Sequence, residues 1–293
     1  MLPAESKSLT IEGSSLEQVL DGVRTRWAPY PVAAWQEAGI SGQLLASVVR
    51  SPQLSNERTV LLYLPATYDT GQKRYPVVYM QDGQNLFDPA TAFGGKTWRA
   101  GEAMTQLAAA GVEAIVVAPY HMEAQRIEEY NPFAHWRHGR GVAYVEFVAE
   151  TLKPIVDHDL RTVPDAGATV IGGSSMGGLI SLYAYCVRPD VFGGAMVMSP
   201  SLWVANGAVY GVVREQLVPG GRLYVDNGTR EGSAQPLAAL AVEKGYVDGA
   251  DLLYVQGKGD RHTEPAWARR LPRALRFLLA SGSALTESGA PGL

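Results

Sequence analysis

Two central segments of the chain are apolar at almost every position. They read Pro-Val-Val-Tyr-Met over residues 76–80 and Ala-Ile-Val-Val-Ala over residues 114–118. A strand with one face in water alternates apolar and polar residues, whereas a parallel strand between two layers of helices is apolar on both faces. These segments therefore predict a parallel sheet that is covered by helices on both sides.

Further strand and helix patterns alternate along the chain. The first two expected strands are separated by the turn-prone residues 51–56, so they should pair antiparallel. We expect strands over residues 44–49, 59–64, 75–80, 114–118, 168–172, 195–198, 222–226 and 251–255, and helices over residues 100–109, 142–156, 175–187, 205–217, 234–244 and 264–280. This order predicts an α/β fold with a mostly parallel sheet of about eight strands. Ligands of such sheets bind beyond the carboxyl ends of the strands.

The chain divides into one large domain and two terminal segments. We expect a catalytic domain over residues 42–280, an N-terminal extension over residues 1–41, and a flexible tail over residues 281–293 that is rich in Ser, Gly, Ala and Pro. Helical spacing over residues 15–28 predicts a short helix in the extension, which could serve as a cap or a dimer arm.

Composition and residue spacing indicate which partners, cofactors and cellular location to expect. The net charge is −4, and no run of Lys or Arg suits a nucleic acid. No apolar run approaches the length of about 18 residues that a membrane span needs, and the first residues lack a signal-peptide pattern, so we expect a cytoplasmic protein. We also expect no metal and no cofactor, because metal-ligand spacings and phosphate loops are missing and the single cysteine, Cys186, lies in an apolar stretch. The composition leaves the possibility of a homo-oligomer open.

The sharpest motif is Gly173-x-Ser175-x-Gly177, between an expected strand and an expected helix. This context is typical of a nucleophile elbow, in which glycines let a strained turn approach its neighbours and the helix N-terminus favours negative charge. The alternative is a glycine–serine loop that only caps a helix. Ser174 is the rival nucleophile, but it lacks the glycine spacing.

A serine nucleophile needs a base and an orienting acid. In the order Ser–acid–His, the base follows the last strand, and His262 is the only histidine after Ser175. The others are His121, His135, His138 and His158. Since the base must be neutral to accept a proton, ester turnover should rise with pH and then level off.

Two carboxylates follow the expected strand over residues 222–226. Asp226 ends that strand, and Glu231 lies further out in the loop, nearer to where an imidazole would reach. Glu231 is the preferred acid, and Asp226 remains the alternative.

The oxyanion of an acyl-transfer reaction needs two convergent N–H groups. Met176 should supply one, because it follows the nucleophile directly, and Gln84 the other, because it follows the third expected strand. Trp203 would line the substrate pocket or, equally, serve as a core residue.

The combined motifs resemble the "Putative esterase" family of α/β-hydrolases, which includes esterase D, feruloyl esterases, enterochelin esterases and mycolyltransferases. The resemblance covers about residues 42–280, and the segments that carry it lie at residues 75–87, 126–133, 172–178, 199–203, 227–231 and 262.

By that resemblance, Ser175, His262 and Glu231 match the family's nucleophile, base and acid, and Gln84 and Met176 match its oxyanion donors. The resemblance implies a serine carboxylic-ester hydrolase that works through an acyl-enzyme. An acyltransferase and a non-catalytic binding protein are the alternatives. The expected partner is a small-molecule ester, and its acyl group stays open among short acyl, feruloyl, acetyl-sugar and siderophore-lactone esters.

Overall fold

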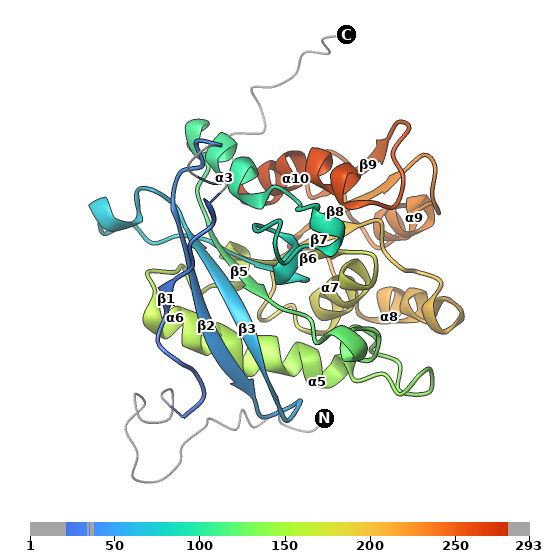
Figure 1. The fold of residues 1–293 in the computed structure, drawn as a ribbon. Helices are drawn as coiled ribbons and strands as arrows, with labels where there is room; N and C mark the ends of the chain where they lie inside the picture. The colour runs from blue at the N-terminus through green and yellow to red at the C-terminus, as the bar shows by residue number, and fades with distance from the viewer. Residues whose placement is uncertain (1–21, 34, 36–37, 281–293) are drawn as a thin grey trace.

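The computed structural model describes residues 22–33, 35 and 38–280, and within them it has one mixed sheet (Figure 1). The order of its nine strands is β1-β2-β3-β5-β4-β6-β7-β8-β9. The strands are β1 (Ala28–Pro29), β2 (Gln43–Ser51), β3 (Asn56–Leu64), β4 (Val77–Met80), β5 (Ile115–Pro119), β6 (Thr169–Ser174), β7 (Gly194–Met198), β8 (Arg222–Gly228) and β9 (Leu252–Gly257). The expected α/β class is confirmed.

Strands β1, β2 and β3 pair antiparallel, and β3 pairs antiparallel with β5. The pairs from β5 through β4 and β6 to β9 are all parallel. The strand beyond the expected eight is β1, in which Ala28 lies opposite Ala46 of β2. Of the N-terminal helix expected over residues 15–28, residues 15–21 lie outside the described part, and residues 22–28 are not helical.

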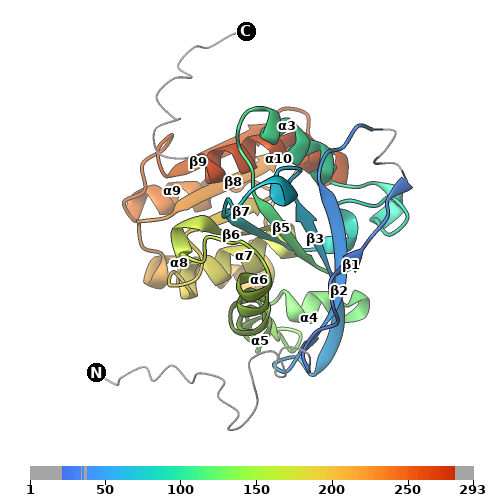
Figure 2. The ribbon, with the colours of Figure 1, turned by 90° about the vertical axis from the view of Figure 1, so that its left-hand side faces the viewer.

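Eight α-helices are labelled in the described part of the chain: α3 (Ala100–Ala109), α4 (Arg126–Glu129), α5 (Gly141–Glu146), α6 (Lys153–Asp159), α7 (Met176–Val187), α8 (Val209–Gln216), α9 (Gln235–Glu243) and α10 (Glu264–Leu279). The single helix expected over residues 142–156 is divided, because a π-helical segment, Phe147–Leu152, joins α5 to α6. Helices α3 and α10 cover one face of the sheet, and α5 to α9 cover the other (Figures 1 and 2). No helix in the described ranges combines the length and apolarity needed to cross a membrane.

Neighbouring residues of the central strands belong to different cores. Val77 and Val117 pack with α5 to α9, whereas Val78 and Val116 pack with α3 and α10. All four are at most 1% exposed. Both faces of these strands are therefore buried, which explains the continuous apolar runs in the sequence.

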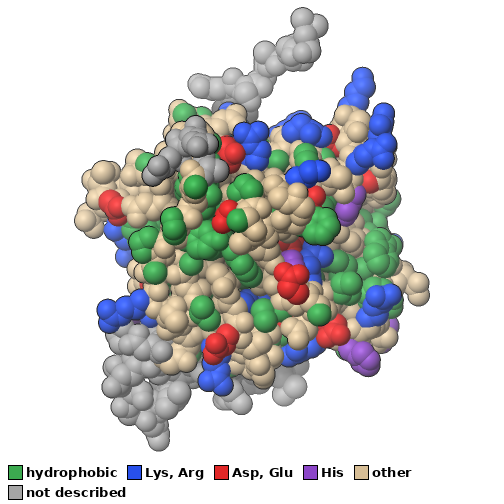
Figure 3. Space-filling model, viewed as in Figure 1, with side chains coloured by type: hydrophobic (Ala, Val, Ile, Leu, Met, Phe, Trp, Pro, Cys, Tyr) green, Lys and Arg blue, Asp and Glu red, His purple; other side chains and the backbone are tan. Residues whose placement is uncertain are grey.

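Helix α10 exposes three of its four arginines on the side opposite its apolar stripe, and the fourth, Arg270, is buried. Leu271 and Leu275 are buried, whereas Arg269, Arg273 and Arg276 are exposed. Figure 3 shows Lys and Arg side chains along the upper edge of the molecule, over this helix. The helix therefore packs on the sheet through one stripe, as its 3.6-residue periodicity requires.

Candidate active site

Ser175 lies between β6 and α7 in a backbone conformation that few residues adopt. Its φ of 57° and ψ of −120° fall outside the ordinary regions for a non-glycine residue. The turn is held to β7, since the Ser175 N–H donates to Met198 O at 3.0 Å. A Cβ at Gly173 would lie 2.9 Å from the Cβ of Gln81, so only glycine fits there. The strained elbow thus presents the half-buried Ser175 at the carboxyl edge of the sheet.

His262 and Glu231 meet at the same edge. His262 follows β9, Glu231 follows β8, and His262 Nδ1 lies 2.6 Å from Glu231 Oε2. Burial by itself would raise the pKa of Glu231, but hydrogen bonds from His262, the Gly228 N–H and Ser199 outweigh burial and hold the pKa below its ordinary value. The ionised carboxylate can therefore keep the imidazole proton on Nδ1 and leave Nε2 free as a base.

Ser175 and His262 face shared cavities without a direct hydrogen bond. In the described part of the chain, the hydrogen-bond partner of Ser175 Oγ is Ser201 Oγ, at 3.2 Å. Catalytic hydrogen bonds of ligand-free enzymes are often long and tighten when substrate binds.

Asp226, the alternative acid, points into the protein instead. It is fully buried, and its two carboxylate oxygens accept hydrogen bonds from Arg270 at 2.9 and 3.1 Å. It also accepts hydrogen bonds from Tyr224 Oη and the Ser199 N–H. Burial raises the pKa of Asp226, against the opposing effect of Arg270. The structure therefore places Glu231, and not Asp226, against His262.

Two backbone N–H groups near Ser175 are free to bind an oxyanion. Apart from bonds internal to a helix or strand, neither the Met176 nor the Gln84 N–H donates to a backbone carbonyl among the described residues. Gln84 lies in the short 3-10 helix Gly83–Asn85 after β4, and two hydrogen bonds join its side chain to the His121 backbone, at 3.1 and 3.3 Å. These bonds fix the turn that carries the Gln84 N–H. The oxyanion roles that the sequence predicts for Met176 and Gln84 stay predictions.

Two cavities flank the nucleophile, and both are lined by Ser175 and His262. The larger one, of about 770 Å³, also contacts Gln84, Arg126 and Phe93. The smaller one, of about 470 Å³, is also lined by Ser201, Leu202, Trp203, Glu231 and Ser233. An ester bond at Ser175 would thus have access to two cavities.

Trp203 borders the smaller cavity and is no core residue. Its side chain is 67% exposed, and its ring meets Trp136 edge to face at a centroid distance of 5.9 Å. The guanidinium of Arg137 covers the Trp136 ring at 5.1 Å. The core interpretation of Trp203 is therefore wrong.

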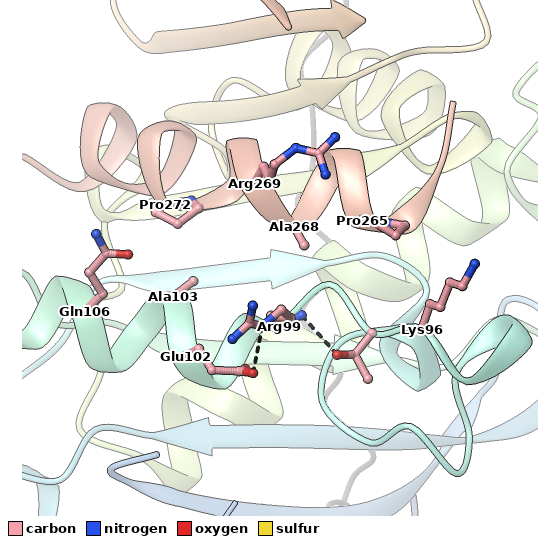
Figure 4. A pocket seen from close by; sticks show the side chains of 10 residues that line it. Lys96, Arg99, Glu102, Ala103, Gln106, Pro265, Ala268, Arg269 and Pro272 are labelled. Carbon is pink, nitrogen blue, oxygen red and sulfur yellow. Dashed lines mark hydrogen bonds and ion pairs between the residues drawn. The ribbon is translucent and has the colours of Figure 1, made fainter. Parts of the chain in front are cut away.

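A separate groove lies beside the larger cavity, between α3 and α10 (Figure 4). Its volume is about 770 Å³, and its lining includes Lys96, Arg99 and Arg269. Arg99 is paired with Glu102 at 3.0 Å. Lys96 lines both hollows. The groove adjoins the candidate site but is lined by none of the residues that the sequence singled out.

The sequence did not assign roles to several residues that the structure places here. Arg126 forms a two-pronged ion pair with Asp82, at 2.6 and 2.8 Å, on the wall of the larger cavity. His121 lies on the same wall, and burial lowers its pKa. A signal existed for Arg126, which begins one of the segments that resemble the family. Across the described ranges, no group of three or more His, Cys, Asp or Glu side chains is arranged to hold a metal ion.

A mostly parallel sheet covered on both faces, with a serine at a strand–helix elbow, defines an α/β-hydrolase. A family model described as "Putative esterase" matches residues 51–278. The chain therefore belongs to the "Putative esterase" family, which confirms the expected resemblance and the class of carboxylic ester hydrolase.

Individual relatives are distant. The chain is 24% identical over 250 residues to the uncharacterized protein YbbA of Bacillus subtilis (strain 168), a match that covers 78% of this chain and 95% of that protein. A ferulic acid esterase structure has a TM-score of 0.61 and 18% identity, over 82% of this chain and 98% of its own. The enterobactin esterase FES from Shigella flexneri, crystallised with 2,3-dihydroxy-N-benzoyl-glycine, has a TM-score of 0.63 and 22% identity, over 82% of this chain and 59% of its own. At these identities the structural likeness shows the fold.

Proposed function

We propose that this protein hydrolyses carboxylic esters in two steps, with Ser175 as nucleophile, His262 as general base and Glu231 as the orienting acid. The observation that carries the proposal is the 2.6 Å contact between His262 Nδ1 and Glu231 Oε2, beside a serine in a strained elbow that lines the same two cavities. A serine that merely caps a helix needs no oriented imidazole beside it.

In the first step, His262 Nε2 takes the proton of Ser175 Oγ as the oxygen attacks the ester carbonyl carbon. The carbonyl oxygen becomes an oxyanion, and the Met176 and Gln84 N–H groups donate to it. The imidazolium then gives its proton to the departing alcohol, and an acyl group remains on Ser175. Water repeats the sequence on the acyl-enzyme, which releases the acid and restores the serine.

The Ser201 hydroxyl contacts the proposed nucleophile. Its hydrogen bond to Ser175 Oγ, at 3.2 Å, holds the side chain of the proposed nucleophile. For attack, the Ser175 hydroxyl must donate its proton to His262, whichever of the two serines donates in the hydrogen bond between them. Substrate in the smaller cavity, which Ser201 lines, would favour this change by occupying the space around Ser201.

The cavities and Trp203 support an ester with a planar group on one side of the scissile bond. An exposed tryptophan offers a large, rigid face on which an aromatic ring can stack. The structural relatives are named for ferulic acid and enterobactin esters, and one was crystallised with a benzoyl compound. We therefore place the aromatic part of the substrate in the smaller cavity and the rest in the larger one.

Replacement of Ser175 tests the proposed function. Ser175→Ala should retain on the order of 10⁻⁴ or less of the turnover of p-nitrophenyl esters and feruloyl esters, with an unchanged circular dichroism spectrum. Ser174→Ala is the matched control, because Ser174 is buried and lies one position away. Equal losses in two folded variants would show that the elbow does not supply the nucleophile.

A further inference from the structure

The hydroxyl of Ser199, at the end of β7, contacts three functional groups at once. Trp267 Nε1 lies 3.0 Å and Arg270 Nη2 lies 2.9 Å from Ser199 Oγ. Glu231 Oε1 lies 2.8 Å from the same oxygen. Ser199 is 4% exposed, so water has little access to this oxygen. The hydroxyl is thus surrounded by partners whose roles as hydrogen-bond donor or acceptor are fixed.

Those partners fix the direction of the hydroxyl proton. Tryptophan and arginine side chains are donors only, whereas an ionised carboxylate only accepts. Ser199 Oγ must therefore accept from Trp267 and Arg270 with its two lone pairs, and its single proton must point to Glu231. A hydroxyl without two such donors would be free to rotate its proton elsewhere.

The same reasoning continues to the imidazole. Glu231 Oε1 receives the Ser199 proton and the Gly228 N–H, which leaves Oε2 to accept from His262 Nδ1. A proton on Nδ1 leaves Nε2 unprotonated. We propose that Ser199 is a positioning residue: held by Trp267 and Arg270, its hydroxyl fixes the Glu231 carboxylate with Oε2 against His262 Nδ1 and so keeps His262 in the tautomer that can act as base. This inference rests on the proposed function, since it assigns a supporting residue to the same catalytic triad.

Arg270 is itself held by two further carboxylates. Besides Asp226, it contacts Asp260 Oδ2 through Nη1 at 2.6 Å. The Arg270 side chain is 6% exposed, and its Nη2 lies 3.8 Å from Glu231 Oε1, too far for a direct hydrogen bond. Arg270 therefore attracts Glu231 directly as an ion pair, and its hydrogen bonds reach Glu231 only through Ser199. Asp226, the alternative acid, thus supports the network one layer below Glu231.

Ser199→Ala tests the inference, with Ser181→Ala as a matched control. Ser181 is also fully buried, and its hydroxyl donates to the Gly177 carbonyl within α7. Hydrogen bonds to charged groups are the stronger ones, so we expect Ser199→Ala to lower kcat about ten- to a hundredfold with KM within about threefold. Ser181→Ala should change kcat less than about threefold. Equal effects of the two variants on kcat would overturn the positioning role.

A second readout needs no substrate and separates this inference from the proposed function. Nitrogen-15 NMR of labelled histidine distinguishes the two neutral tautomers, and His262→Ala identifies the His262 signals. Wild type and Ser181→Ala should hold the proton on Nδ1. Ser199→Ala should populate the other tautomer, because a carboxylate that Ser199 no longer holds can turn away from Nδ1. An unchanged His262 spectrum in Ser199→Ala overturns the inference even if the protein hydrolyses esters. A changed spectrum supports it even if Ser175→Ala reveals a different nucleophile.

If Ser199→Ala does not fold, Trp267→Phe provides the same test. It removes one donor to Ser199 and keeps an aromatic ring against His262, whose ring lies 5.0 Å from that of Trp267. A partial shift of tautomer with a several-fold loss of kcat supports the inference, and a wild-type spectrum overturns it.

Discussion

Glu231→Gln should reverse the tautomer of His262, and the reason lies in the donors around the side chain. The Gly228 N–H and the Ser199 hydroxyl both donate to Oε1. A glutamine at position 231 must keep its carbonyl oxygen there, so its amide NH₂ would face His262 Nδ1. The imidazole would then accept at Nδ1 and carry its proton on Nε2, where it cannot receive the proton of Ser175.

The expected loss follows from two contributions. The variant loses a charge-assisted hydrogen bond, worth about 1.5–3 kcal/mol, and it leaves the imidazolium of the transition state without its carboxylate. The comparable change in a protease triad lowers kcat about 10⁴-fold. Because the His262 side chain is 45% exposed, water screens the imidazolium, and we expect about 10³-fold here.

Steady-state kinetics on a p-nitrophenyl ester give kcat, and thermal unfolding followed by circular dichroism verifies the fold. Asp226→Asn is the comparison, because it removes the other candidate carboxylate. It breaks a buried ion pair with Arg270 and should cost about 3–5 kcal/mol of unfolding free energy, but it should cost less than about tenfold in kcat of the folded protein. A folded Glu231→Gln variant with nearly wild-type kcat, together with an inactive but stable Asp226→Asn variant, would refute the reasoning.

The remaining predictions concern the substrate pocket and the N-terminal segment. Trp203→Ala should raise KM for a feruloyl ester about tenfold and change KM for an acetyl ester less than about threefold, because the side chain is mostly exposed and offers a stacking face. Equal effects on both esters, measured by steady-state kinetics, would contradict the stacking role. Burial alone would raise the pKa of Asp159, but hydrogen bonds from Arg24, His158 and Trp27 outweigh burial and lower the pKa. The stabilising effect of the Asp159 carboxylate is therefore present above about pH 4, and it is lost as the pH falls through the lower pKa of the folded state. The hydrogen-exchange protection of residues 24–30, measured against the intrinsic rate at each pH, should therefore fall in acid in the wild type and be low at neutral pH in Asp159→Asn, and high protection in that variant would contradict the account.

Much of the fold could be predicted because its signals are local. The apolar strands report burial on both faces, and the helix expected over residues 100–109 coincides with α3. Strand β1 has only two residues and is defined by its pairing with β2, which no local pattern reveals. The π-helical segment Phe147–Leu152 was also not visible in the sequence, because its apolar pattern resembles that of an ordinary amphipathic helix. The sequence therefore predicted one continuous helix there.

In the candidate site, too, some residues could be predicted from local patterns and others depend on contacts between distant parts of the chain. His262 could be singled out because the order of the chain restricts the base to the last loop, and the elbow has its own glycine spacing. The choice between Glu231 and Asp226 depended on Arg270, a residue of α10 that lies 44 positions after Asp226. The role of Ser199 depends on Trp267 and Arg270, which follow it by 68 and 71 positions. Contacts over such distances are made by the packing of α10 on the sheet, and a single sequence does not reveal them.

The central claim is that the elbow and the His262–Glu231 pair activate Ser175, and covalent labelling tests it most directly. A fluorophosphonate reacts with a serine that a neighbouring base activates and not with an ordinary one. We predict that the wild-type protein gains one phosphonyl group, that peptide mass spectrometry locates it on Ser175, and that Ser175→Ala and His262→Ala gain none at the same exposure. A folded wild-type protein that stays unlabelled, or a label on another serine, would contradict the account.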